Sequence, residues 1–333
     1  MFLKKGILGL LLIVSSQVFG LGSAKGSVSV FAELLYWQIS EVGADNWAQV
    51  ISPAAANQSI QFLTVPFKWD PGFRVGAAYQ TEDRLWDSVI YYTWYHTQGT
   101  AAAEVNTGEI HSPNSGNFYA NNVQGNGLSG PFYHKAAINW NILFNNLDWE
   151  VGRIFNINNR YSFRPFVGLK AAVINQDIKT DWQTPFDPAF KLPITSFSSA
   201  SENITNNFRG VGPSFGLNML WNMYESPKGT LSLFGNFSGA FLWGNWHITN
   251  VYENNTPVTI TIQNNVRSST STMTKGRIGL NWQNTIQNKE LMVHLGYEGQ
   301  VWLNQLRFYS FDGGRQNNTL YIHGAVLDVC IHF

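Results

Sequence analysis

Two sets of side chains in this sequence could do chemistry, the histidines and the charged residues. His294 and Glu298 come nearest to an acid–base pair, but four residues of extended strand separate them by about 13 Å, beyond hydrogen-bond reach. No nucleophile motif, metal-spaced His pair or phosphate-binding loop is found. We therefore expect no enzyme, no catalytic residue, no bound metal and no cofactor. The histidines are His96, His111, His134, His247, His294, His323 and His332.

The charged residues indicate a different chemistry, contact with ions or polar solutes inside a pore. They alternate with apolar residues, and an extended chain places such alternate positions on one face. In-facing glycines such as Gly72 and Gly76 would leave room for water. A conducting channel and a lumen plugged by paired charges both fit this pattern. The residues expected to line the lumen are Lys68, Asp70, Arg74, Arg164, Lys170, Arg277 and Glu298.

The elements that must position these charges are strands, because the sequence repeats with period two. Segments 67–79, 291–303 and 321–333 each carry mostly apolar residues at every second position, and none of these apolar faces contains Lys, Arg, Asp or Glu. An Arg or Lys on the lipid face costs about 2–4 kcal/mol at the bilayer midplane. Charged residues make up only 13% of the chain and aromatic residues 15%, which favours a membrane barrel over a soluble domain.

We therefore predict a transmembrane antiparallel up-and-down β-barrel of about ten strands; eight or twelve strands also fit. Long connections alternate with short ones, typical of extracellular loops and periplasmic turns. The predicted strands are 27–40, 59–80, 85–98, 134–153, 161–177, 206–222, 229–246, 268–285, 289–306 and 319–333.

Two features complicate these strands. Pro71, Pro165 and Pro213 each remove a ladder donor, so we expect them at bulges or near the membrane edge. Within 136–153 the apolar residues change parity, and a one-residue bulge at Asn145-Asn146 would restore the register.

The N-terminus predicts export. Lys4 and Lys5 precede an apolar stretch at 6–18, which indicates a signal peptide over 1–24 and a barrel over 25–333. The lone Cys330 rules out an internal disulfide, and zero net charge without a basic run argues against nucleic acid. Expected partners are outer-membrane lipid and lipopolysaccharide, and the barrel-assembly machinery through Phe333. The sequence leaves homo-oligomer formation open.

Several motifs resemble those of the Legionella-type major outer membrane proteins, which have relatives among environmental chlamydiae. Segment 67–79 resembles one signature of that family, and segments 147–153, 164–170, 34–37 and 302–305 are similar to others in the same order. The resemblance implies a pore-forming protein of the cell outer membrane that passes small hydrophilic solutes or ions. The alternative is a structural or adhesive surface protein with a blocked lumen and host-binding loops.

Overall fold

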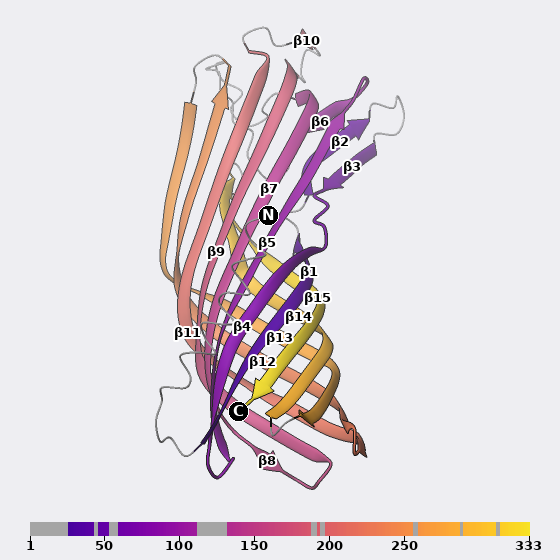
Figure 1. Cartoon of the computed structure of the whole chain (residues 1–333). Coiled ribbons are helices and arrows are strands. Elements are labelled where there is room, and N and C mark those ends of the chain that lie inside the picture. Colours follow the sequence, from indigo (N-terminus) through magenta and orange to yellow (C-terminus); the bar gives the residue numbers. More distant parts are fainter. Residues whose placement is uncertain are drawn as a thin grey trace.

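The structure is a computed structural model in which a single antiparallel sheet closes into a barrel of ten long strands (Figure 1). It describes residues 26–42, 46–52, 59–111, 132–187, 192–193, 197–255, 259–286, 289–310 and 314–333. The predicted signal peptide at 1–24 lies outside these residues. The barrel strands are β1 (Gly26–Val42), β4 (Asp70–Thr81), β5 (Trp86–Glu104), β7 (Phe132–Arg153), β9 (Tyr161–Asp187), β11 (Ser199–Ser226), β12 (Gly229–Asn254), β13 (Thr259–Ile286), β14 (Lys289–Ser310) and β15 (Gly314–His332).

The first and last strands close the barrel. β1 pairs with β15 from Ser29↔His332 to Val42↔Thr319, and its other edge pairs with β4. Each of the ten barrel strands is thus paired on both sides, which a strand structure within lipid requires because unpaired backbone groups are costly there. The predicted all-β barrel of about ten strands is confirmed.

Five short strands complete the described part of the sheet: β2 (Asn46–Ser52), β3 (Ser59–Thr64), β6 (Glu109–His111), β8 (Phe155–Asn156) and β10 (Leu192–Pro193). β2, β3, β6 and β10 lie at the upper end of the barrel, whereas β8 and the C-terminus lie at the lower end (Figure 1). The predicted strand at 59–80 was wrong in extent. It comprises β3, which pairs with β2, and the shorter barrel strand β4.

Several barrel strands are much longer than a membrane requires. β9, β11, β12 and β13 contain 27, 28, 26 and 28 residues, whereas a transmembrane strand needs about 9–11. The loops predicted at 247–267 and 307–318 are therefore largely strand. The short connections at 82–85 and 154–160 agree closely with prediction, although the second contains β8, and the turn predicted at 223–228 shortens to 227–228 because β11 runs on to Ser226. All three lie at the end that carries both barrel termini.

The predicted bulge at Asn145-Asn146 was wrong. β7 pairs with β5 and β9 without a register shift through these residues. Ile138, Trp140, Ile142 and Phe144 point into the barrel, on the same face as the buried Asp148 and Glu150. The even-numbered residues of β7 point inward from Ala136 to Gly152. What changes along the strand is the residue type on each face, since the inward residues are apolar at 138–144 and charged at 148 and 150.

The three prolines occupy places where the ladder is incomplete. Pro71 is the second residue of β4, just before pairing with β5 begins, and Pro165 follows the last pair between β7 and β9. Pro213 falls in a gap of the β11–β12 ladder that involves no register shift. The missing donor is thus accommodated at ladder ends for the first two prolines and in a ladder gap for the third, and none of the three lies at the bulge that was predicted as one possibility.

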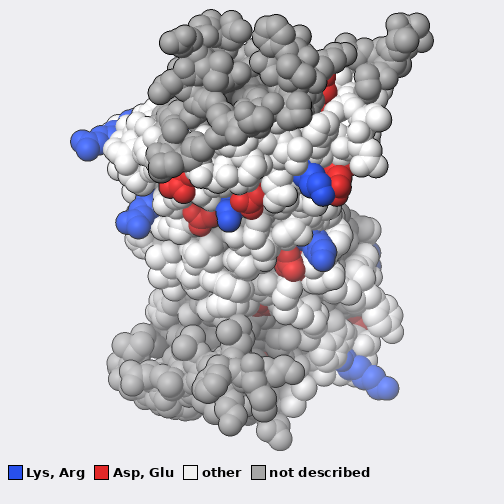
Figure 2. Space-filling model, turned by 90° about the horizontal axis from the view of Figure 1, so that it is seen from above, with Lys and Arg blue, Asp and Glu red and all other residues white. Residues whose placement is uncertain are grey.

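Charged residues are sparse on the outside. Seen from above, the described surface is mostly uncharged; many of the visible blue and red side chains lie beside one another across its middle, and a few lie nearer its edges (Figure 2). The exposed apolar side chains include Leu169, Val211, Phe237, Trp243 and Ile278, which form the outward face of neighbouring strands. This surface is the one that the alternation predicted for contact with lipid.

Candidate functional site in the barrel interior

The lower half of the barrel interior holds a layer of charged side chains that point inward from most of the strands. In a dry interior such charges must be paired, because an isolated buried charge is costly. The described members of this layer are Glu33, Arg74, Asp87, Asp148, Glu150, Arg164, Lys170, Lys275, Arg277, His294, Glu298 and Asp328.

Arg74 is the centre of the larger network. Its Nη1 donates to Glu33 Oε2 at 2.6 Å and its Nη2 to Glu298 Oε1 at 2.9 Å, while its Nε donates to the Thr93 hydroxyl at 3.0 Å. Arg277 Nη1 donates to the other oxygen of Glu33 at 3.0 Å. Two arginines and two glutamates from β1, β4, β13 and β14 are thus joined into one buried network.

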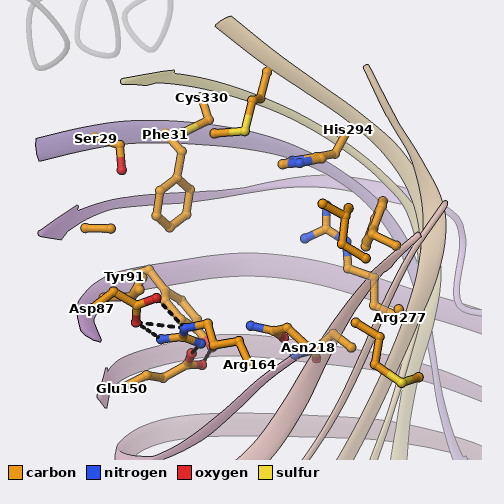
Figure 3. A pocket seen from close by; sticks show the side chains of 18 of the residues that line it. Ser29, Phe31, Asp87, Tyr91, Glu150, Arg164, Asn218, Arg277, His294 and Cys330 are labelled. Atoms are coloured by element: carbon orange, nitrogen blue, oxygen red, sulfur yellow. Dashed lines mark hydrogen bonds and ion pairs between the residues drawn. The ribbon is translucent and has the colours of Figure 1, made fainter. Parts of the chain in front are cut away.

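A second network lies on the facing wall (Figure 3). Arg164 binds Asp87 through Nε at 2.7 Å and Glu150 through Nη1 at 3.1 Å. The Tyr91 hydroxyl donates to Glu150 at 2.8 Å, and Lys275 Nζ donates to the same hydroxyl at 3.3 Å. β5 and β13 are five strands apart in a ring of ten, so this last contact crosses the lumen.

Two further pairs complete the layer. Lys170 Nζ lies 2.5 Å from Asp148 Oδ1, with both side chains almost fully buried. His294 Nδ1 lies 2.5 Å from Asp328 Oδ2 on the neighbouring strand. The sequence analysis considered Glu298, four residues along the same strand, as a partner of His294 and rejected it as too distant. Instead, the structure pairs His294 with Asp328 on the neighbouring strand. The spacing of residues along the sequence does not predict such a cross-strand pair.

Above the charged layer, aromatic side chains fill the lumen. Trp37, Tyr95, Trp140, Phe144 and Trp302 are each at most 1% exposed. The Phe144 and Trp302 ring centroids are 5.4 Å apart in an edge-on arrangement, which is direct ring contact. β7 and β14 are also five strands apart in the ring of ten, so these two residues meet across the middle of the barrel.

The aromatic layer continues upward as an apolar core inside the upper part of the long strands, which we call the outer extension of the barrel. Phe208, Trp246, Ile248 and Tyr252 belong to it and are buried. Burial raises the pKa of Tyr252 to about 12, so this hydroxyl stays protonated at physiological pH. On the same strands the outward face turns polar, as at Asn245, His247 and Thr249. Above the apolar outer band of the barrel, the inward face of these strands is apolar and the outward face is polar, the reverse of the arrangement below. We call this change the exchange of faces.

A cavity of about 440 Å³ lies on the other side of the aromatic layer, towards the short turns. Figure 3 shows Ser29, Phe31 and Cys330 on one wall and the cluster of Asp87, Arg164 and Glu150 on another. Arg277, Asn218 and His294 line it as well (Figure 3). The lumen therefore holds a cavity lined by charged and apolar side chains below, and is filled by apolar side chains above.

The structure brings five of the seven predicted lumen residues together: Arg74, Arg164, Lys170, Arg277 and Glu298. Asp70, at the first position of β4, is half-buried and accepts a hydrogen bond from Thr97 at 2.6 Å. Lys68 is exposed and precedes β4, so the structure does not place it in the barrel wall.

Sequence reasoning missed the aromatic layer because it assigned every apolar face to lipid. The signal was present in β7: Trp140 and Phe144 share their parity with Asp148 and Glu150. Reading the strand straight through, without a bulge, would have placed all four side chains inside.

Among the residues that the structure describes, no three or more His, Cys, Asp and Glu side chains are grouped to hold a metal ion. The same residues include no helix of sufficient length and apolar character to cross a membrane.

A closed sheet with an apolar outer band and a polar-to-aromatic interior defines the class of outer-membrane β-barrels. The chain belongs to the family described as Legionella pneumophila major outer membrane protein precursor, whose family model matches residues 23–333. The suspected family is thus confirmed, and the protein is a protein of the cell outer membrane. No curated protein sequence matches the chain.

Solved structures with similar overall topology are remote. The outer membrane protease OmpT from Escherichia coli matches with a TM-score of 0.38 and 10% identity, covering 92% of this chain and 96% of its own. A Pseudomonas aeruginosa FadL homologue matches with a TM-score of 0.30 and 10% identity, covering 92% and 90%. The Ralstonia pickettii toluene transporter TbuX matches with a TM-score of 0.16 and 8% identity, covering 93% and 90%. Similarity at this level assigns no activity to this chain.

One expectation from the sequence is corrected by this comparison. We expected no enzyme, because no catalytic motif was found. That exclusion was wrong, because the solved barrels that match include an outer-membrane protease. The lack of a catalytic motif therefore does not exclude an enzyme.

Proposed function

We propose that this protein is a structural barrel whose lumen is closed at rest and whose long outer strands form a platform on the cell surface. The observation that carries the proposal is the contact between Phe144 and Trp302 across the lumen. Close-packed protein interiors contain few voids as large as a water molecule, so rings in contact across the lumen leave little room for a solute.

The layer beneath supports the same proposal. Lys275 and Tyr91 also meet across the barrel, and the arginines beside them are held by carboxylates at 2.5–3.1 Å. A solute crossing this layer would have to separate buried ion pairs, and breaking one such pair costs about 3–5 kcal/mol. Charge pairing and aromatic packing therefore oppose permeation at two successive levels.

The outer extension suits a surface role. Its apolar core makes it a folded body outside the lipid, and its outward residues are polar. Binding residues often lie on connecting segments that a rigid scaffold holds in place. The candidate adhesive surface is therefore the wall of the extension and its short strands β2, β3 and β6.

Passive diffusion of small hydrophilic solutes or ions is the second candidate. It is favoured by the cavity of about 440 Å³ with charged side chains in its lining, which lies below the aromatic layer. In this case Arg74, Arg164, Lys170, Arg277 and Glu298 would set the selectivity, and the aromatic layer would have to open. Lys68 and Asp70 would then act only near the outer mouth.

Planar-bilayer conductance separates the two candidates. We expect the wild-type protein to be electrically silent and the double variant Phe144→Ala/Trp302→Ala to form discrete channels, because removing both rings opens the layer. The matched control is Phe237→Ala/Trp243→Ala, which deletes the same two residue types from the lipid face and should stay silent. Discrete wild-type channels would refute the closed lumen and favour the diffusion pore.

A further inference from the structure

A groove of about 430 Å³ crosses the outer surface of β7, β9, β11 and β12 at the level of the exchange of faces. Its lower part is a row of outward apolar residues. The ladders place Leu147 opposite Ala171, Ala171 opposite Val211, and Val211 opposite Trp243. Ala171 has the smallest side chain of the four, so the row is lowest in its middle. This row lies at the upper end of the apolar band that faces lipid.

The row directly above carries hydrogen-bond donors. Asn145, Arg209 and Asn245 lie in it on β7, β11 and β12. Asn145 Oδ1 accepts a hydrogen bond from the Tyr92 hydroxyl at 2.6 Å, and Asn245 Oδ1 accepts one from the Ser268 backbone N–H at 3.0 Å. Both amide oxygens are thus used within the chain. Neither Nδ2 donates to a residue that the structure describes, so both remain available to a ligand.

Arg209 is the one charged side chain among the described residues that line this groove. It is exposed, and it forms no hydrogen bond, ion pair or ring contact within the part of the chain that the structure describes. Exposed lysines higher on the wall are paired instead: Lys135 lies 2.7 Å from Glu104, and Lys179 lies 3.6 Å from Asp181. The groove therefore combines an accessible, unpaired guanidinium and two amide donors with an apolar row beneath them.

These features define a ligand by its chemistry. A guanidinium matches two oxygens of a phosphate in a bidentate contact, and the amide donors match further oxygen atoms. The apolar row matches a hydrocarbon chain, and the exposed Trp243 ring lies where aromatic residues meet lipid head groups. The groove also lies on the side of the apolar band away from the short turns, which is the outer leaflet of the membrane.

We propose that this groove binds lipopolysaccharide through its lipid A, a phosphorylated disaccharide that carries acyl chains. One phosphate binds Arg209, sugar oxygens accept from Asn145 and Asn245, and an acyl chain lies over Ala171. The donor row extends over three strand spacings, or about 14 Å, which suits a disaccharide better than the smaller head group of a phospholipid. The inference goes beyond the proposed function, because the groove is outside the barrel and its occupancy does not depend on the lumen.

The test is native mass spectrometry of the folded protein in detergent micelles, titrated with lipid A at constant ionic strength. We expect saturable binding of one lipid A per barrel. Lipid A from which the phosphates have been removed should bind about tenfold or more weakly, because it loses the charged hydrogen bonds to Arg209. Phosphatidylglycerol should also bind more weakly than lipid A, and inorganic phosphate at the same concentration should not displace it.

Two variants probe the two halves of the groove, each with a matched control. Arg209→Gln should weaken lipid A binding about tenfold or more, whereas Lys228→Gln, which removes an exposed cation at the opposite end of the β11–β12 hairpin, should leave it unchanged. Ala171→Phe fills the middle of the apolar row and should also weaken binding. Its control is Ala325→Phe, an exposed position on β15, five strands from β9 in the ring of ten. Heat-modifiable gel mobility verifies that each variant is folded.

Three results would overturn the proposal. The first is the lack of saturable lipid A binding to the wild-type protein. The second is equal binding of lipid A and either its phosphate-free form or phosphatidylglycerol, or displacement by inorganic phosphate, since the groove would then not recognise lipid A itself. The third is an affinity that Arg209→Gln or Ala171→Phe changes no more than its control does.

Discussion

Lys170 and Asp148 form the simplest ion pair inside the barrel. Their side chains are 4% and 2% exposed, and the two atoms lie 2.5 Å apart. Asn146 also donates to Asp148, so the carboxylate has a second partner on its own strand. Because both charges have left water, removing one should cost more than removing both.

We therefore expect Lys170→Met to lower the free energy of unfolding by about 3–5 kcal/mol, since it leaves the Asp148 charge buried with only a neutral partner. The double variant Lys170→Met/Asp148→Leu should recover most of that loss. Urea unfolding in lipid vesicles measures both. The control is Lys135→Met, which breaks the exposed pair with Glu104 and should cost less than about 1 kcal/mol. A double variant as unstable as the single one would contradict this account of the pair.

The identity of the inward charges could be predicted from the sequence, but their partners could not. Period-two alternation placed Arg74, Lys170 and Glu298 inside because parity alone decides the face of a strand. Their pairing depends on register and on closure of the barrel: Arg74 reaches Glu298 across 224 residues of sequence. No local pattern carries that information.

At the scale of the element, each long strand has two parts. In β7 the lower part is charged inside and apolar outside, with Asp148 inward and Leu147 outward. The upper part is apolar inside and polar outside, with Trp140 inward and Asn141 outward. The sequence analysis assumed one environment for the whole strand, so it needed a bulge that does not exist and ended several strands too early.

The short turns hold neighbouring strands in register, and the one between β11 and β12 depends on Gly229. This residue has φ of +131°, and a Cβ there would lie 2.5 Å from the Gln283 carbonyl oxygen. We expect Gly229→Ala to destabilise the barrel by about 1–3 kcal/mol in urea unfolding, because strained backbone conformations cost about that much. Gly276→Ala is the matched control on β13, since a Cβ there meets nothing within 4 Å. Equal effects of the two variants would rule out the turn as the cause.

At the scale of the whole molecule, the exchange of faces marks where the barrel leaves the bilayer. The outward residues of β9 are apolar from Phe163 to Val173 and polar from Asn175 onward. The strand ladders place the outward apolar residues Leu147 of β7, Val211 of β11 and Trp243 of β12 side by side, at the height of the upper end of this span. An apolar span of 11 residues is what a tilted strand needs to cross the hydrocarbon, so the remaining wall stands outside it.

This placement predicts a sharp depth dependence of charge substitutions along a single strand. Leu169 is outward, 47% exposed and near the middle of the apolar span of β9. Asn175 is outward as well, six residues further along, which is about 15 Å higher in a tilted strand. Leu169→Arg should cost about 2–4 kcal/mol in the free energy of unfolding, whereas Asn175→Arg should cost less than about 1 kcal/mol, because arginine is penalised on the lipid face only near the midplane. Urea unfolding in vesicles of one fixed lipid measures both variants under the same conditions. A large penalty at Asn175 would show that hydrocarbon extends higher than the exchange of faces, and the apolar core of the upper barrel would then lie inside the membrane.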